Sequence, residues 1–381
     1  MKPVSLMLVK HYHLLKHMSI KFHHFKKIAC AILKKGEMTM KQKKKVTFLD
    51  IAQKTGYSKT TISRYFNQPD SLTVETQDII AKALEELDYH ENKLARVLAN
   101  GKTEIIGILV PDLHMHYYAE LLSSILDTTE NHNYKFMIFP EKESIASEQE
   151  LLNELMAYNV EGLLVISRTI PSSSLANLPI PVVTIEREDQ YVNSVNTDNY
   201  LGGLLATQAL IDCGCETVFH INNPLKKNNP GYGRIRGYEK VVKDNAINHK
   251  EFIIKTNDSY SKLIPVMENI VKQIEIDYAN IKKGIFVSND TYANVLINVL
   301  IRKYGTLPDD WKIVGFDDSP ISSEAIIPFS TIRQHISEIS QAAIDLLVEQ
   351  MEERKKRRPN IDETLHHITI PVSLIKRETT K

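Results

Sequence analysis

Short apolar runs and amphipathic helical stretches alternate along the chain from Glu104 onward, and this alternation limits the fold more than any other feature. The apolar runs, which have the continuous character of strands buried on both faces, are 105–110, 135–139, 162–166, 182–185, 217–221, 284–287 and 312–315. The helical stretches are 118–131, 147–158, 199–213, 232–245, 261–279, 291–304 and 336–352. Such alternation predicts parallel sheets with right-handed crossovers. The units are too numerous for one compact sheet, so we expect an α/β fold with two doubly wound parallel-sheet subdomains.

Polar residues follow the predicted strands, at the sheet edge where ligands bind in folds of this kind. They are Pro111-Asp112 with Tyr117-Tyr118, Glu186-Arg187, Asn222-Asn223 with Arg234 beyond a loop, Ser288-Asn289-Asp290, and Asp317-Asp318. Polar side chains pair with hydroxyl groups, and aromatic rings cover the apolar faces of a ligand. The set therefore predicts a cleft for a polyhydroxylated ligand.

A shorter, all-helical pattern precedes the alternation at Val46–Asn67, which reads VTFLDIAQKTGYSKTTISRYFN. Thr47 and Asp50 have the spacing of a capping box at the start of a first helix. Gly56 suits the end of that helix, because glycine enters the left-handed region freely. Ser58 is placed to cap a second helix. Two helices joined by a tight turn within about twenty residues have the size of a DNA-reading helix-turn-helix.

The second of these helices has two different faces. Ile62 and Phe66, four residues apart, should face inward together. Lys59, Thr60 and Arg64 then point outward, and such side chains suit base edges and phosphates. The alternative is an ordinary helical hairpin with a solvated basic face.

A third helix and a short linker should follow. Thr73 can cap the helix, whose apolar stripe consists of Ile79, Ile80, Ala83, Leu84 and Leu87. Packing across the first two helices would complete a three-helix head. Residues 92–100 (NKLARVLAN) are short for an isolated helix, so they predict a linker that becomes ordered on DNA or on a second copy of the chain.

Charge is distributed unevenly, although the formal net charge is zero. Residues 1–49 contain 12 Lys and one acid, Glu37, so the other 332 residues carry 35 basic and 46 acidic side chains, a net of −11. This asymmetry suits a head that meets a polyanion. The three cysteines, Cys30, Cys213 and Cys215, provide no disulfide framework and point to a reducing compartment. No membrane-spanning apolar run and no signal peptide is recognisable, so we expect a cytoplasmic protein with no membrane partner.

Residues 1–39 fit neither pattern. Their histidines are irregularly spaced and lack acidic or cysteine partners, so no metal site is expected. Residues 34–37 (KKGE) can be encoded by a bacterial ribosome-binding sequence, and we expect translation to begin at Met40, or alternatively at Met38. On this view 1–39 is a non-native leader or a disordered extension.

From Val46 onward the chain resembles the LacI/GalR family of transcriptional regulators. The segments that carry the resemblance are VTFLDIAQKTGYSKTTISRYFN, NKLARVLANGKTEIIGILVPD, VNTDNYLGGLLATQALIDCG, RIRGYEKVV, IFVSND, WKIVGFDDSP and ITIPVSLIKRE. They occur in the family's order and spacing over nearly 90% of the chain. The resemblance implies a helix-turn-helix head, 40–91, a hinge, 92–103, and an effector-binding and dimerisation domain, 104–381.

The resemblance also implies roles for individual residues. Lys59, Thr60 and Arg64 would contact base edges and phosphates, and Thr47, Ser58 and Asn67 would hold the DNA backbone. In the hinge, Leu98 would wedge between base pairs from the minor groove, with Asn92 and Ala95 also at the DNA. Arg234, Asn289 and Asp317 match the family's effector-gripping positions, and Tyr117, Tyr118 and Glu186 are further candidates. Two departures are the Asn-, Lys- and Pro-rich segment 222–233 and Cys215, which stands where many members have histidine.

The sequence therefore predicts a homodimeric repressor of carbohydrate uptake and catabolism genes. Each head would read half of a near-palindromic operator. A sugar or sugar derivative between the two subdomains would control operator affinity, with release or tightening both allowed. A phosphocarrier-protein corepressor is a further candidate partner, and neither a cofactor nor a metal is expected.

Two other functions compete with this one. A sugar-binding protein of a transport system would share the predicted core without the DNA role. An enzyme would use Asp290, Asp317 and Asp318 as catalytic carboxylates. No nucleophile elbow, phosphate loop or metal-spaced cluster supports catalysis, so we expect no enzymatic activity. The effector, the operator and the choice between dimer and tetramer stay open.

Overall fold

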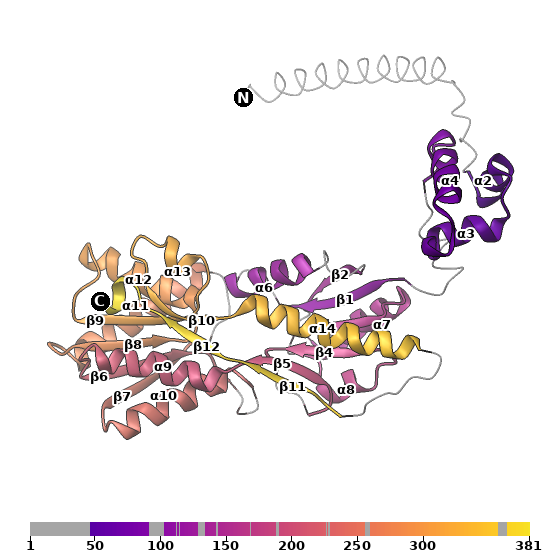
Figure 1. The fold of residues 1–381 in the computed structure, drawn as a ribbon. Coiled ribbons are helices and arrows are strands. Elements are labelled where there is room, and N and C mark those ends of the chain that lie inside the picture. Colours follow the sequence, from indigo (N-terminus) through magenta and orange to yellow (C-terminus); the bar gives the residue numbers. More distant parts are fainter. Residues whose placement is uncertain are drawn as a thin grey trace, which may run out of the picture. The chain divides into compact units, whose positions relative to one another are not determined.

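A computed structural model describes residues 46–90, 103–111, 113, 115–128, 134–141, 144–167, 169–187, 190–225, 227, 229–255, 260–356 and 364–381 (Figure 1). These residues fall into two compact units, a helical head of residues 46–90 and a core unit that begins at residue 103. The predicted leader and Asp112 lie outside the described residues, and so does the predicted hinge up to residue 102.

The head consists of α2 (Phe48–Thr55), α3 (Lys59–Asn67), the 3-10 helix η1 (Pro69–Ser71) and α4 (Val74–Glu86). Ile51, Ile62 and Ile80, one from each α-helix, are fully buried and form its core. The predicted helical head is thus confirmed, but the inclusion of Ile79 in the apolar stripe of α4 is wrong, because Ile79 is 41% exposed. The i, i+3, i+4, i+7 repeat that starts at Ile80 already fills the inward face, which leaves Ile79 to one side.

Side-chain caps set the limits of the helices in the head. The backbone N–H and the hydroxyl of Thr47 both donate to Oδ2 of Asp50 at 2.7 Å. Gly56 ends α2 with φ of 77°, and Ser58 Oγ accepts from the backbone N–H of Thr61 at 3.1 Å. These caps fix the tight turn between α2 and α3 where the sequence predicted it.

The first lobe of the core unit is built on a sheet with the order β11-β5-β4-β3-β1-β2, in which all neighbours are parallel. Its strands are β1 (Ile105–Val110), β2 (Lys135–Pro140), β3 (Gly162–Val165), β4 (Val182–Ile185), β5 (Asn193–Thr197) and β11 (His367–Ile370). Helices α6 (His116–Asp127) and α14 (Ile336–Lys355) pack with Ile106 and Ile108 on one face. Helices α7 (Ile145–Ala157) and α8 (Ser172–Ala176) pack with Leu109 on the other, because side chains alternate along a strand.

The second lobe has the sheet order β12-β10-β9-β8-β6-β7. Its strands are β6 (Thr217–Asn222), β7 (Asn248–Ile253), β8 (Lys283–Val287), β9 (Trp311–Asp317), β10 (Ser330–Gln334) and β12 (Val372–Ile375). Helices α9 (Asn199–Asp212) and α10 (Tyr232–Asp244) cover one face, and α11 (Tyr260–Asp277) and α12 (Asp290–Tyr304) cover the other. The short helices α13 (Ile321–Glu324) and η3 (Glu378–Thr380) complete the lobe. Within the described sheets only β12 runs antiparallel, to β10, so the predicted fold class is confirmed.

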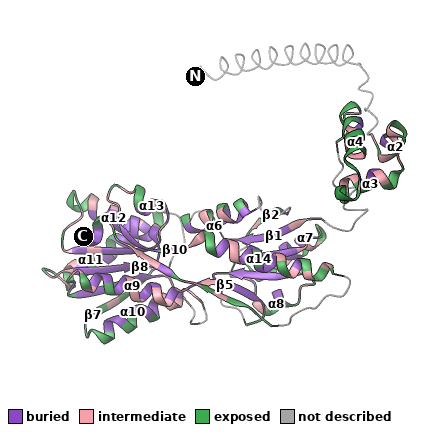
Figure 2. Cartoon of the chain, in the orientation of Figure 1, coloured by how far each residue is buried: buried purple, intermediate pink, exposed green. Residues whose placement is uncertain are grey.

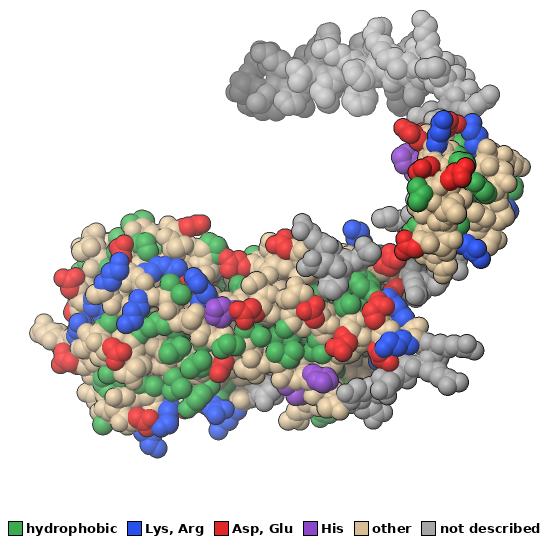
Figure 3. Space-filling view, viewed as in Figure 1, with side chains coloured by type: hydrophobic (Ala, Val, Ile, Leu, Met, Phe, Trp, Pro, Cys, Tyr) green, Lys and Arg blue, Asp and Glu red, His purple; other side chains and the backbone are tan. Residues whose placement is uncertain are grey.

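The chain passes between the lobes at three places in the described sequence: from β5 to α9, from β10 to α14, and from β11 to β12 (Figure 1). The central strands are buried, and the exposed residues gather on the outer faces of the helices (Figure 2). Acidic and basic side chains are interspersed on the visible face of the core unit (Figure 3). That face therefore lacks the single-sign field of a nucleic-acid-binding surface.

Candidate functional site

The first candidate site is the solvent face of α3 in the head. Lys59, Thr60, Arg64 and Asn67 are all exposed. At about 100° per residue Thr60, Arg64 and Asn67 lie on the side away from buried Ile62, while Lys59, the first residue of α3, stands about 60° from Ile62. Neither Lys59 nor Arg64 forms an ion pair within the described residues, so both charges are available to an external anion. A short helix face of this kind can donate to base edges and to phosphate oxygens.

The other predicted DNA contacts have more local roles in this structure. Thr47 and Ser58 are exposed, and each takes part in the cap described above. The Asn67 amide donates to the backbone oxygen of Ser63 at 2.9 Å. Asn92, Ala95 and Leu98 lie outside the described residues.

The second candidate site is a cleft between the lobes of the core unit. All six predicted effector residues line one pocket there: Tyr117, Tyr118 and Glu186 from the first lobe, and Arg234, Asn289 and Asp317 from the second. Asn222, Asn223 and Ser288 are among the other residues of its wall. The enclosed volume is about 90 Å³. Pockets that hold drug-sized ligands usually have about 300–1,000 Å³. The two lobes therefore lie close together in this structure.

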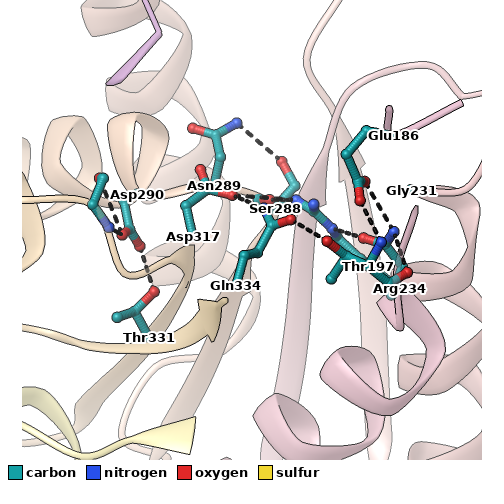
Figure 4. A network of polar contacts seen from close by, with 12 residues as sticks. Glu186, Thr197, Gly231, Arg234, Ser288, Asn289, Asp290, Asp317, Thr331 and Gln334 are labelled. Atoms are coloured by element: carbon teal, nitrogen blue, oxygen red, sulfur yellow. Dashed lines mark hydrogen bonds and ion pairs between the residues drawn. The ribbon is translucent and has the colours of Figure 1, made fainter. Parts of the chain in front are cut away.

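Glu186 joins the first lobe to the start of α9 (Figure 4). It accepts a hydrogen bond from the backbone N–H of Thr197 through Oε1. Its Oε2 accepts from the side-chain amide of Asn199 at 3.2 Å. Asn199 Oδ1 in turn accepts from Nε of Arg234 at 2.7 Å. The carboxylate is thus linked through one amide to the guanidinium on the other lobe.

Arg234 continues the network into the second lobe. Its Nη1 donates to the backbone oxygen of Ser288 and lies 4.0 Å from Oδ1 of Asp317. Its guanidinium carbon lies 3.5 Å from the centroid of the Phe316 ring, within the range of a cation–π contact. The Gln334 amide donates to Oδ1 of Asp317, and the Gln334 oxygen accepts from the Thr197 hydroxyl. The contacts therefore form a closed ring that includes residues of two interlobe crossings.

Close helix packing puts Arg234 at the cleft. A Cβ on Gly203 of α9 would lie 2.3 Å from the backbone oxygen of Arg234, and one on Gly237 of α10 would lie 2.4 Å from that of Tyr200. Only glycine permits this approach of the two backbones. Asn199 and Arg234 can therefore meet directly at the start of the two helices.

The carboxylates of the cleft stand on unusual backbone. Glu186 has φ of 53° after β4, and Asp317 and Asp318 have φ of 118° and 55° at the end of β9. Non-glycine residues seldom adopt these values, and such strain persists only where the surroundings impose it. The strained turns aim the side chains of Glu186 and Asp317 into the pocket that they line.

Burial shifts the proton affinity of several groups around the cleft. It raises the pKa of Asp317 to about 7, against the opposing effect of the Arg234 charge. It also raises the pKa of Asp290 well above its usual value, although the Thr331 hydroxyl donates to this carboxyl at 2.6 Å. Burial lowers the pKa of His220 to about 4, so this imidazole is neutral at physiological pH.

Three members of the ring, Thr197, Asn199 and Gln334, were not among the residues predicted from the sequence. They stand at the ends of β5 and β10 or just beyond, and both strands have polar sequences, NSVNT and STIRQ. Recognition of these strands would have put Thr197 and Gln334 at the carboxyl ends of the strands of their two sheets, where the predicted residues also lie.

A larger cavity of about 880 Å³ lies in the first lobe, among α8, β4, β5, α14 and β11. Its wall includes Leu175, Leu346 and Ile368, and it holds none of the six predicted effector residues. The convergence of strained carboxylates and a guanidinium favours the interlobe cleft as the functional site. Among the described residues no cluster of His, Cys, Asp and Glu has the arrangement of a metal site, and no helix is long and apolar enough to cross a bilayer.

Two protein families match the sequence. Residues 47–92 match the family described as bacterial regulatory proteins, lacI family, and residues 207–380 match a periplasmic binding protein-like domain. The chain is 28% identical over 339 residues to the ribose operon repressor of Halalkalibacterium halodurans, covering 88% of this chain and 97% of that protein. It is 25% identical over 343 residues to catabolite control protein A of Priestia megaterium, covering 88% and 99%.

Among solved structures, the fold is similar to that of a Lac repressor dimer bound to operator and the anti-inducer ONPF. The TM-score is 0.74 at 23% identity, and the match covers 88% of this chain and 99% of the other.

Proposed function

This chain belongs to the lacI family of bacterial regulatory proteins, and we propose that it is a transcriptional repressor whose affinity for operator DNA is controlled by a small-molecule effector. One observation carries the proposal: six side chains from both lobes converge on one pocket, in a chain that also carries a helix-turn-helix with a free basic face. The two related proteins described above are named as a repressor and a control protein rather than as enzymes.

On the DNA side, Lys59, Thr60 and Arg64 contact base edges and phosphates, and Thr47, Ser58 and Asn67 hold the backbone. Their exposure on or beside α3 supports these roles. The hinge residues Asn92, Ala95 and Leu98 would reach the minor groove. The division that goes with these roles is a head of residues 40–91, a hinge of 92–103 and an effector domain of 104–381.

On the effector side, a sugar or sugar derivative binds in the interlobe cleft. The closed ring and the volume of about 90 Å³ indicate that the lobes separate or rotate when a ligand enters. A ligand shifts such an equilibrium only by its difference in affinity for the two arrangements. The effector would therefore bind one lobe arrangement more tightly and increase its population. That arrangement would then set the position of the heads.

Two copies of the chain would bind one near-palindromic operator, since two-fold symmetry in the protein calls for matching symmetry in the DNA. The related Lac repressor has been seen as a dimer bound to operator. The regulated genes would serve carbohydrate uptake and catabolism, and the protein would act in the cytoplasm. A phosphocarrier protein remains a candidate corepressor.

Titration onto DNA tests this function. The full chain is added to DNA from upstream of its own and neighbouring genes, at two salt concentrations, with and without a panel of sugars. Tight binding that weakens with salt and responds to one compound is expected. Absence of specific binding at any salt would contradict the repressor and leave the alternative of a transport-type solute-binding protein, which the periplasmic binding protein-like match would then favour.

A further inference from the structure

The cavity of about 880 Å³ in the first lobe is separate from the interlobe cleft, with which it shares no wall residue. Its apolar wall includes Leu175, Leu178, Ile180, Val192, Leu346 and Ile368. These side chains come from α8 and the segment that follows it, from the residue before β5, from α14 and from β11. Small-molecule sites usually have about 300–1,000 Å³ and mostly apolar walls with a few polar groups. The cavity therefore has the size and the lining of a ligand site.

One polar side chain of this wall lacks a partner. Gln350 of α14 lines the cavity, and its Nε2 is buried and makes no hydrogen bond within the described part of the chain. A buried N–H donor without an acceptor is costly, so this amide calls for an acceptor from outside the protein. A ligand that fits both the wall and the amide has an apolar body and a hydrogen-bond acceptor, such as a carbonyl oxygen.

The cavity is bordered by three elements that carry the chain between the lobes in the described sequence. β5 continues into α9, α14 follows β10, and β11 continues into β12. The cavity lies at the ends of these elements that are remote from the crossings, because Val192 precedes β5, Gln350 is in the C-terminal half of α14, and Ile368 is near the start of β11. A ligand placed among these ends would displace the three connections together and so favour one lobe arrangement.

The C-terminal end of α14 is also tied to the start of β1. Nζ of Lys355 lies 3.0 Å from Oε2 of Glu161, and Oε1 of Glu161 accepts from the backbone N–H of Glu104 at 2.8 Å. Glu104 has φ of 57°, which a non-glycine residue keeps only where its surroundings impose it. Glu104 directly follows the proposed hinge of residues 92–103, so a movement of α14 would reach the point where the chain arrives from the head.

We infer that the first-lobe cavity is a second ligand site, for a largely apolar molecule with a hydrogen-bond acceptor such as a carbonyl oxygen, and that its occupancy changes operator affinity through α14. The regulatory part of the inference rests on the proposed function, whereas the binding part does not. Gln350 is the specificity-determining residue of the site. Lys355 and Glu161 are positioning residues that join α14 to β1.

A pair of probes with one carbon skeleton tests the role of Gln350. The full chain is titrated by ligand-observed NMR with 4-phenyl-2-butanone and with butylbenzene, which lacks the carbonyl oxygen. Gln350→Leu should weaken binding of the ketone about 5- to 10-fold and leave binding of the hydrocarbon unchanged or tighter, because only the ketone accepts from the amide. Equal effects on the two probes, or no binding of the ketone to the wild type, would overturn the site.

A matched pair of tryptophan variants locates the binding. Ala176 and Ala157 are both exposed, and each is the last residue of a helix in the first lobe, but only Ala176 lines the cavity. Ala176→Trp should therefore weaken binding of both probes at least about 10-fold, whereas Ala157→Trp should leave it unchanged. Probe binding that Ala176→Trp does not alter would show that the probes bind elsewhere and would refute the inference.

Operator titration with and without saturating ketone tests the regulation. The ketone should change operator affinity at least about 5-fold, the lower range of allosteric coupling. Lys355→Met removes the tie to Glu161 and should abolish this change while ketone affinity is retained. Lys240→Met, which removes a surface pair with Asp244 on α10, is the control and should keep the change. An operator affinity that bound ketone leaves unaltered would disprove the regulatory part, and operator binding without ketone reports separately on the proposed function.

Discussion

The side-chain amide of Gln334 donates a hydrogen bond to Oδ1 of Asp317 at 2.7 Å. The same Gln334 accepts from Thr197, so one side chain connects two interlobe crossings with a carboxyl group of the cleft. Gln334 is uncharged, and its role comes from these two contacts. A ligand that displaces Asp317 must also disturb the two interlobe crossings to which Gln334 and Thr197 belong.

Gln334→Ala should therefore weaken the coupling between effector and operator. We expect the ratio of operator affinities without and with saturating effector to fall at least about 5-fold, the lower range of allosteric coupling. Operator titrations measure this ratio. Arg333→Ala is the control, because Arg333 is exposed and pairs with Asp318 outside the ring. An unchanged ratio in Gln334→Ala would exclude Gln334 from the coupling.

The raised pKa of Asp317 predicts a pH-dependent stability. Burial moves this pKa from 3.8 to about 7, so protonation favours the folded core. The contribution is complete below about pH 4 and is lost as the pH rises toward 7. The asparagine side chain in the Asp317→Asn variant does not titrate, so this variant does not lose stability in this way as the pH rises. The difference in free energy of unfolding, variant minus wild type, should therefore increase by about 2 kcal/mol from about pH 5 to about pH 8.

Urea unfolding at the two pH values checks this, with exposed Asp127→Asn as control. A parallel response of Asp317→Asn and wild type to pH would contradict the assignment. The same variant should also lose its response to effector while it retains operator binding.

Arg64 on α3 should contribute to sequence recognition. Arg64→Ala is expected to cost about 1–3 kcal/mol of operator binding and to relax discrimination between operator and scrambled DNA. Lys82→Ala removes one exposed charge from α4 instead and should weaken both DNAs slightly and equally. Titration of each variant onto both DNAs separates the effects. If the two variants behaved alike, a general electrostatic role for Arg64 would be indicated.

The contact between α9 and α10 should tolerate no side chain at Gly203. Gly203→Ala is expected to destabilise the core unit by about 1–3 kcal/mol, because the new Cβ overlaps the Arg234 backbone oxygen, and to weaken effector binding by displacing Arg234. Gly305→Ala provides a contrast, since Gly305 has φ of 81° and open space around it. It should cost about 1 kcal/mol without change in effector affinity. Calorimetry and ligand titration on both variants test this, and retained effector affinity in Gly203→Ala would argue against the positioning role.

The central strands could be predicted from the sequence because they are apolar on both faces. The strands β5 and β10 could not, because they are buried yet polar. Their side chains find partners far along the chain: Asn193 Oδ1 accepts from the His366 backbone N–H at 2.6 Å, and Thr331 donates to Asp290. No local pattern reveals such pairing.

The candidate site shows the same division. Arg234, Asn289 and Asp317 follow recognisable strands or belong to recognisable motifs, and the structure brings them to one pocket. Asn199 follows β5 and Gln334 ends β10, two strands that have no apolar signature in the sequence, so their part in the ring became visible only in three dimensions. The left-handed backbone of Glu186 and Asp317 likewise has no sequence signal, since neither residue is glycine.

The placement of β11 and β12 has a consequence for synthesis. These neighbouring strands complete an edge of each sheet, β11 beside β5 and β12 beside β10. A chain emerging from the ribosome therefore completes the first sheet only after residue 370 and the second only after residue 375. A message that stops before codon 367 would yield a product with two open sheet edges, which are templates for aggregation. Both sheets of the core unit thus receive their last strands at the end of synthesis, after every other sheet strand has been made.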